Sequence, residues 1–153
     1  MNKIKYILLF LVINFSALWI GSLLMGVGPR DDWYLSLNKA PWTPPGWVFG
    51  TAWTFIMICF SIYLGYLFNK SNTKKEQITF LIQLVLNISW NFIFFNQKLV
   101  SLGVLVLILL IVTLLYFFFN LSNDIKKARL LLLPYIIWLC IATSLNLYIL
   151  IHN

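Results

Sequence analysis

Neutral polar and aromatic side chains inside apolar segments are the residues of this chain whose types and spacing could serve chemistry. In the run LIQLVLNISWNFIFF, at residues 81–95, Gln83, Asn87 and Asn91 recur every four residues, and Trp90 lies beside them. Side chains four apart share one face of a helix, so we expect these amides and this indole to lie together. Such a face either forms hydrogen bonds between helices or lines a ligand pocket, and the spacing leaves both interpretations open.

Two other segments carry aromatic residues at helical spacing. The stretch KAPWTPPGWVFGTAWT, at residues 39–54, includes Trp47, Phe49, Gly50, Trp53 and Thr54. The stretch LLLPYIIWLCIATSLNLY, at residues 131–148, includes Tyr135, Trp138, Ala142 and Asn146 at spacings of three and four. A buried indole N–H normally needs an acceptor, and we expect amides such as Asn87 and Asn91 to serve. A hollow walled by indoles and a few amides suits a flat, hydrophobic ligand.

Ionised and metal-binding groups are scarce where this chemistry would occur. The four acidic residues, Asp31, Asp32, Glu76 and Asp124, all fall in loops or at helix ends. Their absence from mid-membrane positions argues against a proton-coupled pump or a small multidrug exporter. Cys59 and Cys140 lie in apolar segments without a second Cys or His nearby, so we expect small buried hydrophobes and neither a disulfide nor a metal site. No cofactor is expected.

The elements that position these residues follow from composition. The chain has 153 residues, of which 61% are hydrophobic and 10% charged, whereas soluble domains are about 45–50% apolar. Five apolar runs, near residues 5–27, 45–68, 77–97, 100–121 and 130–151, each reach the roughly 20 residues that cross a bilayer as a helix. They are too continuous for barrel strands. The sequence predicts an all-α integral membrane bundle of five transmembrane helices, in a single domain over residues 1–153.

The connection at residues 28–44 is the one long loop between these runs. Its aromatic residues Trp33, Tyr34 and Trp42 argue against disorder, so we expect it to fold over the outer mouth of the bundle. Pro44 and Pro45 suit the first turn of the second helix. Pro134 suits the first turn of the fifth, or kinks it slightly. Ser122 or Asn123 is expected to end one helix and cap the next.

Basic residues predict the orientation. With alternating helices, one side holds eight of them: Lys3, Lys5, Lys70, Lys74, Lys75, Lys126, Lys127 and Arg129. The other side holds three: Arg30, Lys39 and Lys98. Because cytoplasmic loops carry the basic excess, we expect the N-terminus in the cytoplasm of the cell, and residues 28–44 and the C-terminus outside the cell membrane. The net charge of +7 then faces membrane lipid, and no nucleic-acid partner is expected.

Three motifs in order resemble one family. WYLSLNKAPWTPPGWVFGTAWT, QLVLNISWNFIFF and PYIIWLCIATSLN resemble the TspO family, bacterial relatives of the mitochondrial translocator protein once called the peripheral benzodiazepine receptor. The resemblance extends from the first helix to Asn146. It implies a five-helix fold, commonly a homodimer, that binds porphyrins such as protoporphyrin IX, haem-related tetrapyrroles and benzodiazepine-site ligands. It also implies, for several bacterial members, a light- and oxygen-dependent breakdown of protoporphyrin.

The resemblance assigns roles to individual residues. Trp53 and Trp138 match the two pocket tryptophans associated with that photochemistry. The positions that match the pocket lining are Trp33, Tyr34, Pro41, Phe49, Asn87, Trp90 and Ala142. Gly50 and Asn91 join this ligand-binding set because they share the helix faces described above.

Two departures from the family matter. The order Lys39-Ala40-Pro41-Trp42 differs from the family's usual K-P-x-W, so the bend of the loop is expected to shift by one residue. The cholesterol motif of the animal proteins is incomplete, because no Lys or Arg follows Tyr148, and we predict no sterol binding.

The sequence favours a membrane tetrapyrrole sensor or scavenger and leaves light-dependent degradation open. The alternatives are a transporter of porphyrins or other lipophilic molecules, and a regulatory partner of another membrane protein.

Overall fold

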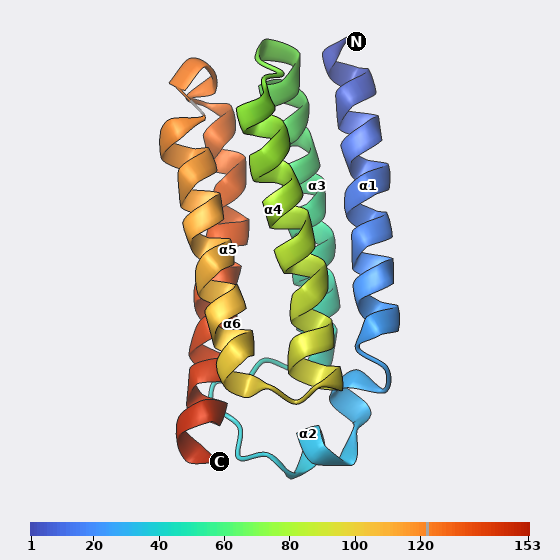
Figure 1. The fold of residues 1–153 in the computed structure, drawn as a ribbon, viewed down its shortest axis with the longest axis vertical. Helices are drawn as coiled ribbons and strands as arrows, with labels where there is room; N and C mark the ends of the chain where they lie inside the picture. Colours follow the sequence, from blue (N-terminus) through green and yellow to red (C-terminus); the bar gives the residue numbers. More distant parts are fainter. Residues whose placement is uncertain (122) are drawn as a thin grey trace.

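Five long helices run side by side through the protein, seen in a computed structural model that describes residues 1–121 and 123–153 (Figure 1). They are α1 (Lys3–Leu24), α3 (Gly46–Lys70), α4 (Lys74–Asn91), α5 (Val100–Asn120) and α6 (Leu133–His152). Short helical turns lie between them: η1 (Gly28–Arg30), α2 (Asp32–Ser36), η2 (Phe92–Asn96), η3 (Asn123–Ile125) and η4 (Ala128–Leu132). With their flanking turns, the five are long and apolar enough to cross a membrane, which confirms the predicted bundle.

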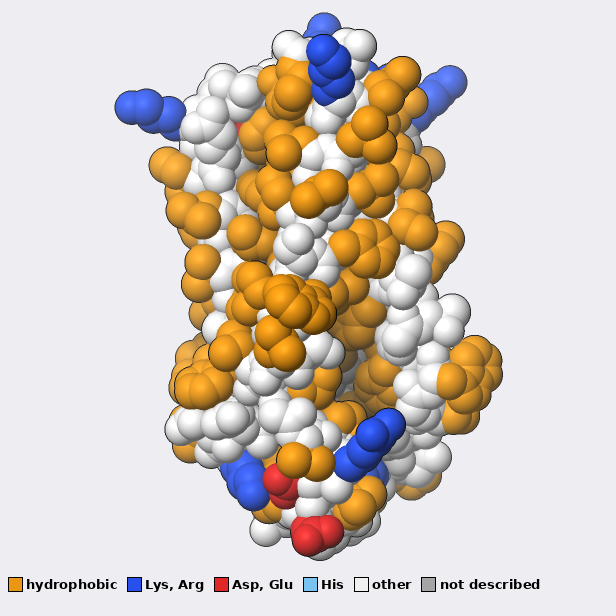
Figure 2. Space-filling model, turned by 90° about the vertical axis from the view of Figure 1, so that its right-hand side faces the viewer, with side chains coloured by type: hydrophobic (Ala, Val, Ile, Leu, Met, Phe, Trp, Pro, Cys, Tyr) orange, Lys and Arg blue, Asp and Glu red, His pale blue; other side chains and the backbone are white. Residues whose placement is uncertain are grey.

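The two ends of the bundle differ. The N-terminus and the α3–α4 connection lie at one end, whereas α2, the α4–α5 turn and the C-terminus lie at the other (Figure 1). Lys and Arg side chains gather at both ends, and the surface between them is mostly hydrophobic (Figure 2). We refer to the end that carries α2 as the loop end.

Local sequence signals explain where the helices begin. Pro45 is the N-cap of α3, so the proline pair lies just before the helix. The expectation that the pair lies in the first turn is therefore off by one position. Thr73 and Glu76 form a capping box that begins α4. The buried Glu76 carboxylate therefore stabilises the start of this helix. Pro134 lies in the first turn of α6, as expected. Of the two predicted capping residues, Ser122 lies outside the described residues and Asn123 begins η3.

The core runs between the helices along the bundle and extends toward the loop end as far as Leu107 and Ala142. Its largest side chains, among them Phe60, Tyr63, Phe117 and Tyr135, are fully buried. Two hydrogen bonds between helices join neutral polar groups there: Gln83 Nε2 donates to Tyr135 Oη at 2.9 Å, and Asn14 Nδ2 donates to Ser61 Oγ at 2.9 Å. Gln83 is therefore an interhelical contact.

The two cysteines differ in environment. Cys59 is buried, as expected, whereas Cys140 is exposed, so the prediction of burial is wrong for it. Cys140 lies two residues beyond Trp138 on α6, on another face of the helix, and small apolar side chains are tolerated equally well against lipid.

A π-helical turn ends α4 and was not predicted. In this turn, η2, the Gln97 amide donates to the Phe92 carbonyl at 2.9 Å, five residues back instead of four. Phe94 and Phe95 lie in this turn, and both line the hollow described below. Single π turns of this kind often occur at functional sites.

Helices α1 and α3 approach closely at one glycine. A Cβ atom added to Gly65 would lie 3.1 Å from the backbone nitrogen of Ile7 and 3.2 Å from its Cα. We expect Gly65→Val to lower the free energy of unfolding by about 1–3 kcal/mol, because α1 must move away. Gly50→Val is the matched control, since a Cβ at Gly50 meets no atom within 4 Å. The thermal midpoints of both variants in detergent test this, and equal midpoints would contradict it.

Candidate functional site

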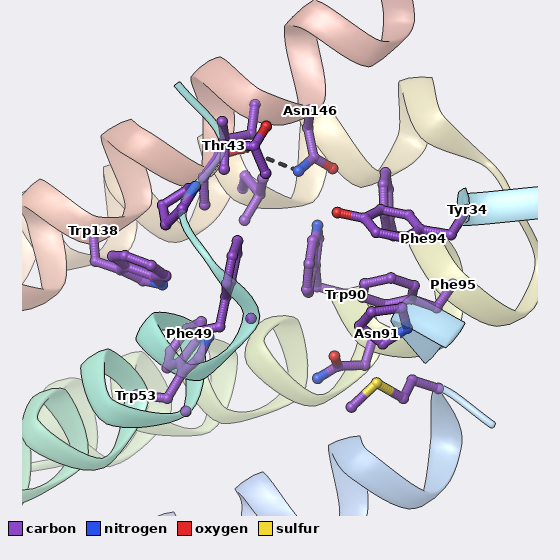
Figure 3. Close-up of a pocket in the computed structure, with 18 of the residues that line it drawn as sticks. Tyr34, Thr43, Phe49, Trp53, Trp90, Asn91, Phe94, Phe95, Trp138 and Asn146 are labelled. Atoms are coloured by element: carbon purple, nitrogen blue, oxygen red, sulfur yellow. Dashed lines mark hydrogen bonds between the residues drawn. The ribbon is translucent and has the colours of Figure 1, made fainter. Parts of the chain in front are cut away.

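A cavity of about 540 Å³ lies at the loop end of the bundle, within the 300–1,000 Å³ typical of ligand pockets. Helices α1, α3, α4, α5 and α6 and the loop before α3 all contribute to its wall. The lining residues are Leu18, Ser22, Met25, Pro29, Tyr34, Lys39, Thr43, Pro44, Gly46, Phe49, Gly50, Trp53, Thr54, Asn87, Trp90, Asn91, Phe94, Phe95, Leu107, Trp138, Ala142, Leu145, Asn146 and Ile149. Figure 3 shows most of these side chains pointing into the same space.

Seven aromatic side chains line the cavity, and each packs against another ring. The Trp53 indole meets the ring of Tyr135 edge-on, with centroids 5.6 Å apart. Trp138 meets Phe49 edge-on at 5.3 Å, and Phe49 stands between Trp138 and Trp90 in Figure 3. Rings fixed in this way offer preformed flat surfaces to a ligand.

A third indole stacks within α4 and its π turn. Trp90 lies parallel to Phe94, with centroids 5.3 Å apart and planes at 9°. Its Nε1 is buried and has no hydrogen-bond partner among the described residues. Neither Asn87 nor Asn91 accepts from it, so the expected indole–amide pairing is wrong for Trp90. The unpaired N–H remains available to an acceptor on a ligand.

Asn146 supplies a matching acceptor on α6. Its Nδ2 donates to the Ala142 carbonyl at 3.0 Å, whereas its Oδ1 is buried without a partner among the described residues. In Figure 3 the Asn146 amide and the indole nitrogen of Trp90 point toward the same part of the cavity as the Tyr34 hydroxyl. One unpaired donor and one unpaired acceptor therefore lie in a mainly apolar and aromatic wall, where they can orient a ligand.

An unpaired buried acceptor has a cost that can be measured. We expect Asn146→Leu, which keeps the size of the side chain, to raise the free energy of unfolding of the ligand-free protein by about 1 kcal/mol. The thermal midpoint in detergent reports this. A lower midpoint would mean that the Asn146 side chain stabilises the empty cavity.

The loop before α3 covers the cavity as a lid. Asp31 accepts a hydrogen bond from the Trp33 amide at 2.9 Å, which begins α2, and pairs with Lys98 Nζ at 3.3 Å. The ring of Tyr34 packs on Phe95, with centroids 5.3 Å apart. Burial raises the pKa of the Tyr34 phenol, so the hydroxyl stays neutral and able to donate at physiological pH.

Most of the sequence-predicted site residues lie together in this wall. Those that line the cavity are Tyr34, Phe49, Gly50, Trp53, Asn87, Trp90, Asn91, Trp138 and Ala142. Trp33 does not line it and instead packs on Phe94 from outside, at 5.8 Å between centroids. Pro41 also does not line it: Pro41 is exposed on a turn, while Ala40 beside it is buried.

Sequence reasoning missed two groups of lining residues. Leu18, Ser22 and Met25 of α1 recur at spacings of four and three, but no aromatic or amide residue marked that face. Phe94 and Phe95 continue the spacing that runs through Asn87 and Asn91, and extending that pattern by one turn would have found them.

Comparisons with known proteins agree with one another. The model of the TspO/MBR family matches residues 8–152. The chain is 35% identical over 125 residues to the "Tryptophan-rich protein TspO" of Archaeoglobus fulgidus, covering 80% of this chain and 81% of that protein. It is 33% identical to the "Tryptophan-rich sensory protein" of Cereibacter sphaeroides (76% and 73% covered) and 30% identical to the "Translocator protein" of Ovis aries (78% and 73% covered).

Proposed function

The chain belongs to the TspO/MBR family of membrane proteins, and from that premise we propose that it is a sensor or scavenger that binds tetrapyrroles such as protoporphyrin IX. The observation that carries this proposal is that Trp53, Trp90 and Trp138, from three different helices, line one covered cavity. Broad planar ligands gain most of their binding energy from such flat aromatic walls. A tetrapyrrole ring is a ligand of this shape.

The proposed contacts divide by chemistry. Trp53 and Trp138 stack on or against the ring, while Phe49, Gly50 and Ala142 give it space. The amides of Asn87 and Asn91, the indole N–H of Trp90 and the Tyr34 hydroxyl meet its polar groups. Trp33 acts through Phe94, and Pro41 shapes the loop without touching the ligand.

Equilibrium titration tests the binding. Protoporphyrin IX added to the purified protein in detergent is expected to quench tryptophan fluorescence to saturation at one ligand per chain. Benzodiazepine-site ligands are expected to compete, because they would occupy the same cavity. Quenching that never saturates would indicate partition into the detergent and would reject a specific site.

Light-dependent degradation of protoporphyrin is a second, finer proposal for the same cavity. The ligand absorbs the light, and the protein supplies orientation together with oxidisable indoles at Trp53 and Trp138. Illumination of the complex in air tests it. The proposal is rejected, and binding kept, if the protein yields no absorbing product beyond those of free protoporphyrin under the same light.

Transport is the alternative that one relative's name, "Translocator protein", suggests. Within the described residues no Asp or Glu lines the cavity, so the carboxylates that commonly couple transport to a proton gradient have no counterpart there. Counterflow in proteoliposomes separates the two functions, because only a transporter accumulates ligand against a gradient. A role as regulatory partner of another membrane protein is a third alternative.

The remaining expectations concern the assembly and its orientation. We propose a homodimer in the cell membrane with the N-terminus in the cytoplasm and the loop end outside. Eight basic residues at the N-terminal end against three at the loop end favour this orientation. Cysteine labelling of intact cells at exposed Asn38 (Asn38→Cys) tests it, and cross-linking in membranes tests the dimer.

A further inference from the structure

Lys39 is the one charged side chain among the described residues that line the cavity. The other lining groups are apolar, aromatic, hydroxyl or amide. An ammonium ion beside an apolar cavity raises the question of which anion it faces, because a charge in partly dehydrated surroundings is stabilised mainly by a partner of opposite sign.

The ammonium of Lys39 has weak partners within the protein. Its Nζ donates to the carbonyls of Leu35 at 3.3 Å and Leu37 at 3.4 Å, both longer than usual for a hydrogen bond. It also lies 4.8 Å from the centre of the Tyr34 ring. No carboxylate pairs with it: the ion pair found in the described part of the chain joins Lys98 to Asp31. An ammonium has three donors, so one stays free.

The backbone around Lys39 is fixed to α6. The Asn38 amide donates to Asn153 Oδ1 at 2.8 Å, and Asn153 Nδ2 donates back to the Asn38 carbonyl at 3.2 Å. Ala40 is 4% exposed. Trp42 Nε1 donates to Ser144 Oγ at 3.2 Å. Bonds on both sides thus hold Lys39 at the rim, so its position is part of the built site.

We propose that Lys39 makes the cavity selective for flat apolar ligands that carry a carboxylate, with the ring inside the cavity and the acid at its rim. This inference rests on the proposed function and names the ligand class more narrowly. Protoporphyrin IX is a ligand of this kind, because its two propionate groups lie on one edge of an otherwise apolar ring. The Lys39 ammonium donates a charge-assisted hydrogen bond to one carboxylate.

The experiment compares protoporphyrin IX with its dimethyl ester, which has the same ring and no charge. In wild-type protein the acid is expected to bind roughly three- to tenfold more tightly than the ester, a range that suits a partly exposed ion pair. Lys39→Met is expected to remove this preference, because it lowers the affinity for the acid and leaves the affinity for the ester unchanged. Lys39→Arg keeps it. Arg30→Met, which removes an equal charge from an exposed residue at the same end that does not line the cavity, keeps it as well.

The outcomes separate this inference from the function on which it rests. If wild-type protein binds the acid and the ester equally tightly, Lys39 confers no selectivity and the inference is overturned while tetrapyrrole binding stands. If Arg30→Met abolishes the preference as Lys39→Met does, the effect belongs to the net charge of this end and the inference also fails. If neither ligand saturates the protein, both proposals fall. Unchanged affinity of Lys39→Met for the ester shows that its cavity is intact. If Lys39→Met does not fold, Lys39→Gln is used in its place.

Discussion

The double variant Trp53→Phe/Trp138→Phe is expected to bind protoporphyrin IX roughly tenfold more weakly than wild-type protein and to form none of the proposed light-dependent product. Phenylalanine keeps the edge-on contacts with Tyr135 and Phe49, so the fold should hold. It gives a ligand a smaller flat surface, and a phenyl ring is far harder to oxidise than an indole. Titration and illumination of the same preparation measure both effects.

Two tryptophans outside the cavity provide the matched control. Trp19 is 66% exposed and Trp47 is 72% exposed, and neither lines the cavity. Trp19→Phe/Trp47→Phe therefore removes as many indoles from the surface and should leave both affinity and product unchanged. Full affinity in a folded Trp53→Phe/Trp138→Phe protein would count decisively against the assigned site.

Filling the cavity is expected to have the largest effect on binding. Ala142 lies on α6 between Trp138 and Asn146 and lines the wall, so Ala142→Phe directs a ring into space that the ligand needs. We expect affinity to fall on the order of a hundredfold. Because Ala142 is itself buried against the core, the thermal midpoint of Ala142→Phe in detergent is measured beside the titration, so that lost affinity is separated from lost folding.

The control for this change is Val112→Phe on α5. Val112 is 57% exposed and does not line the cavity, so the same ring is added where lipid can accommodate it. Its affinity for protoporphyrin IX should equal that of wild-type protein. If Ala142→Phe binds as tightly as Val112→Phe does, the ligand does not occupy this cavity.

The helices were predictable because a helix that crosses the bilayer needs a long apolar run, and such runs are visible in the hydropathy of the sequence. Helix starts were predicted within a few residues, since Pro45 and Pro134 restrict where a helix can begin. The faces of α3, α4 and α6 were predictable from aromatic and amide residues at spacings of three and four. These signals put Trp53, Trp138 and Asn87 on defined helix faces, and the resemblance to the TspO family predicted that those faces share one pocket.

Other features depend on tertiary packing. Gln83 and Asn87 share one face of α4, yet Gln83 bonds to Tyr135 and Asn87 lines the cavity, because they lie at different depths. The spacing could not distinguish these depths. The face of α1 that lines the cavity carries Leu18, Ser22 and Met25, which resemble lipid-facing residues. No residue pattern in this apolar run marked the π turn at Phe92–Asn96.

Where the ligand lies in the bound protein tests the central claim most directly. An experimental structure with protoporphyrin IX is predicted to show the ring inside the covered cavity, against Trp53 and Trp138 and beneath Tyr34. A shallow groove on the outer face of α3, lined by Trp47, Thr51, Phe55 and Ile58 among others, is a second apolar surface. A ring found in that groove, with the covered cavity empty, would contradict the account.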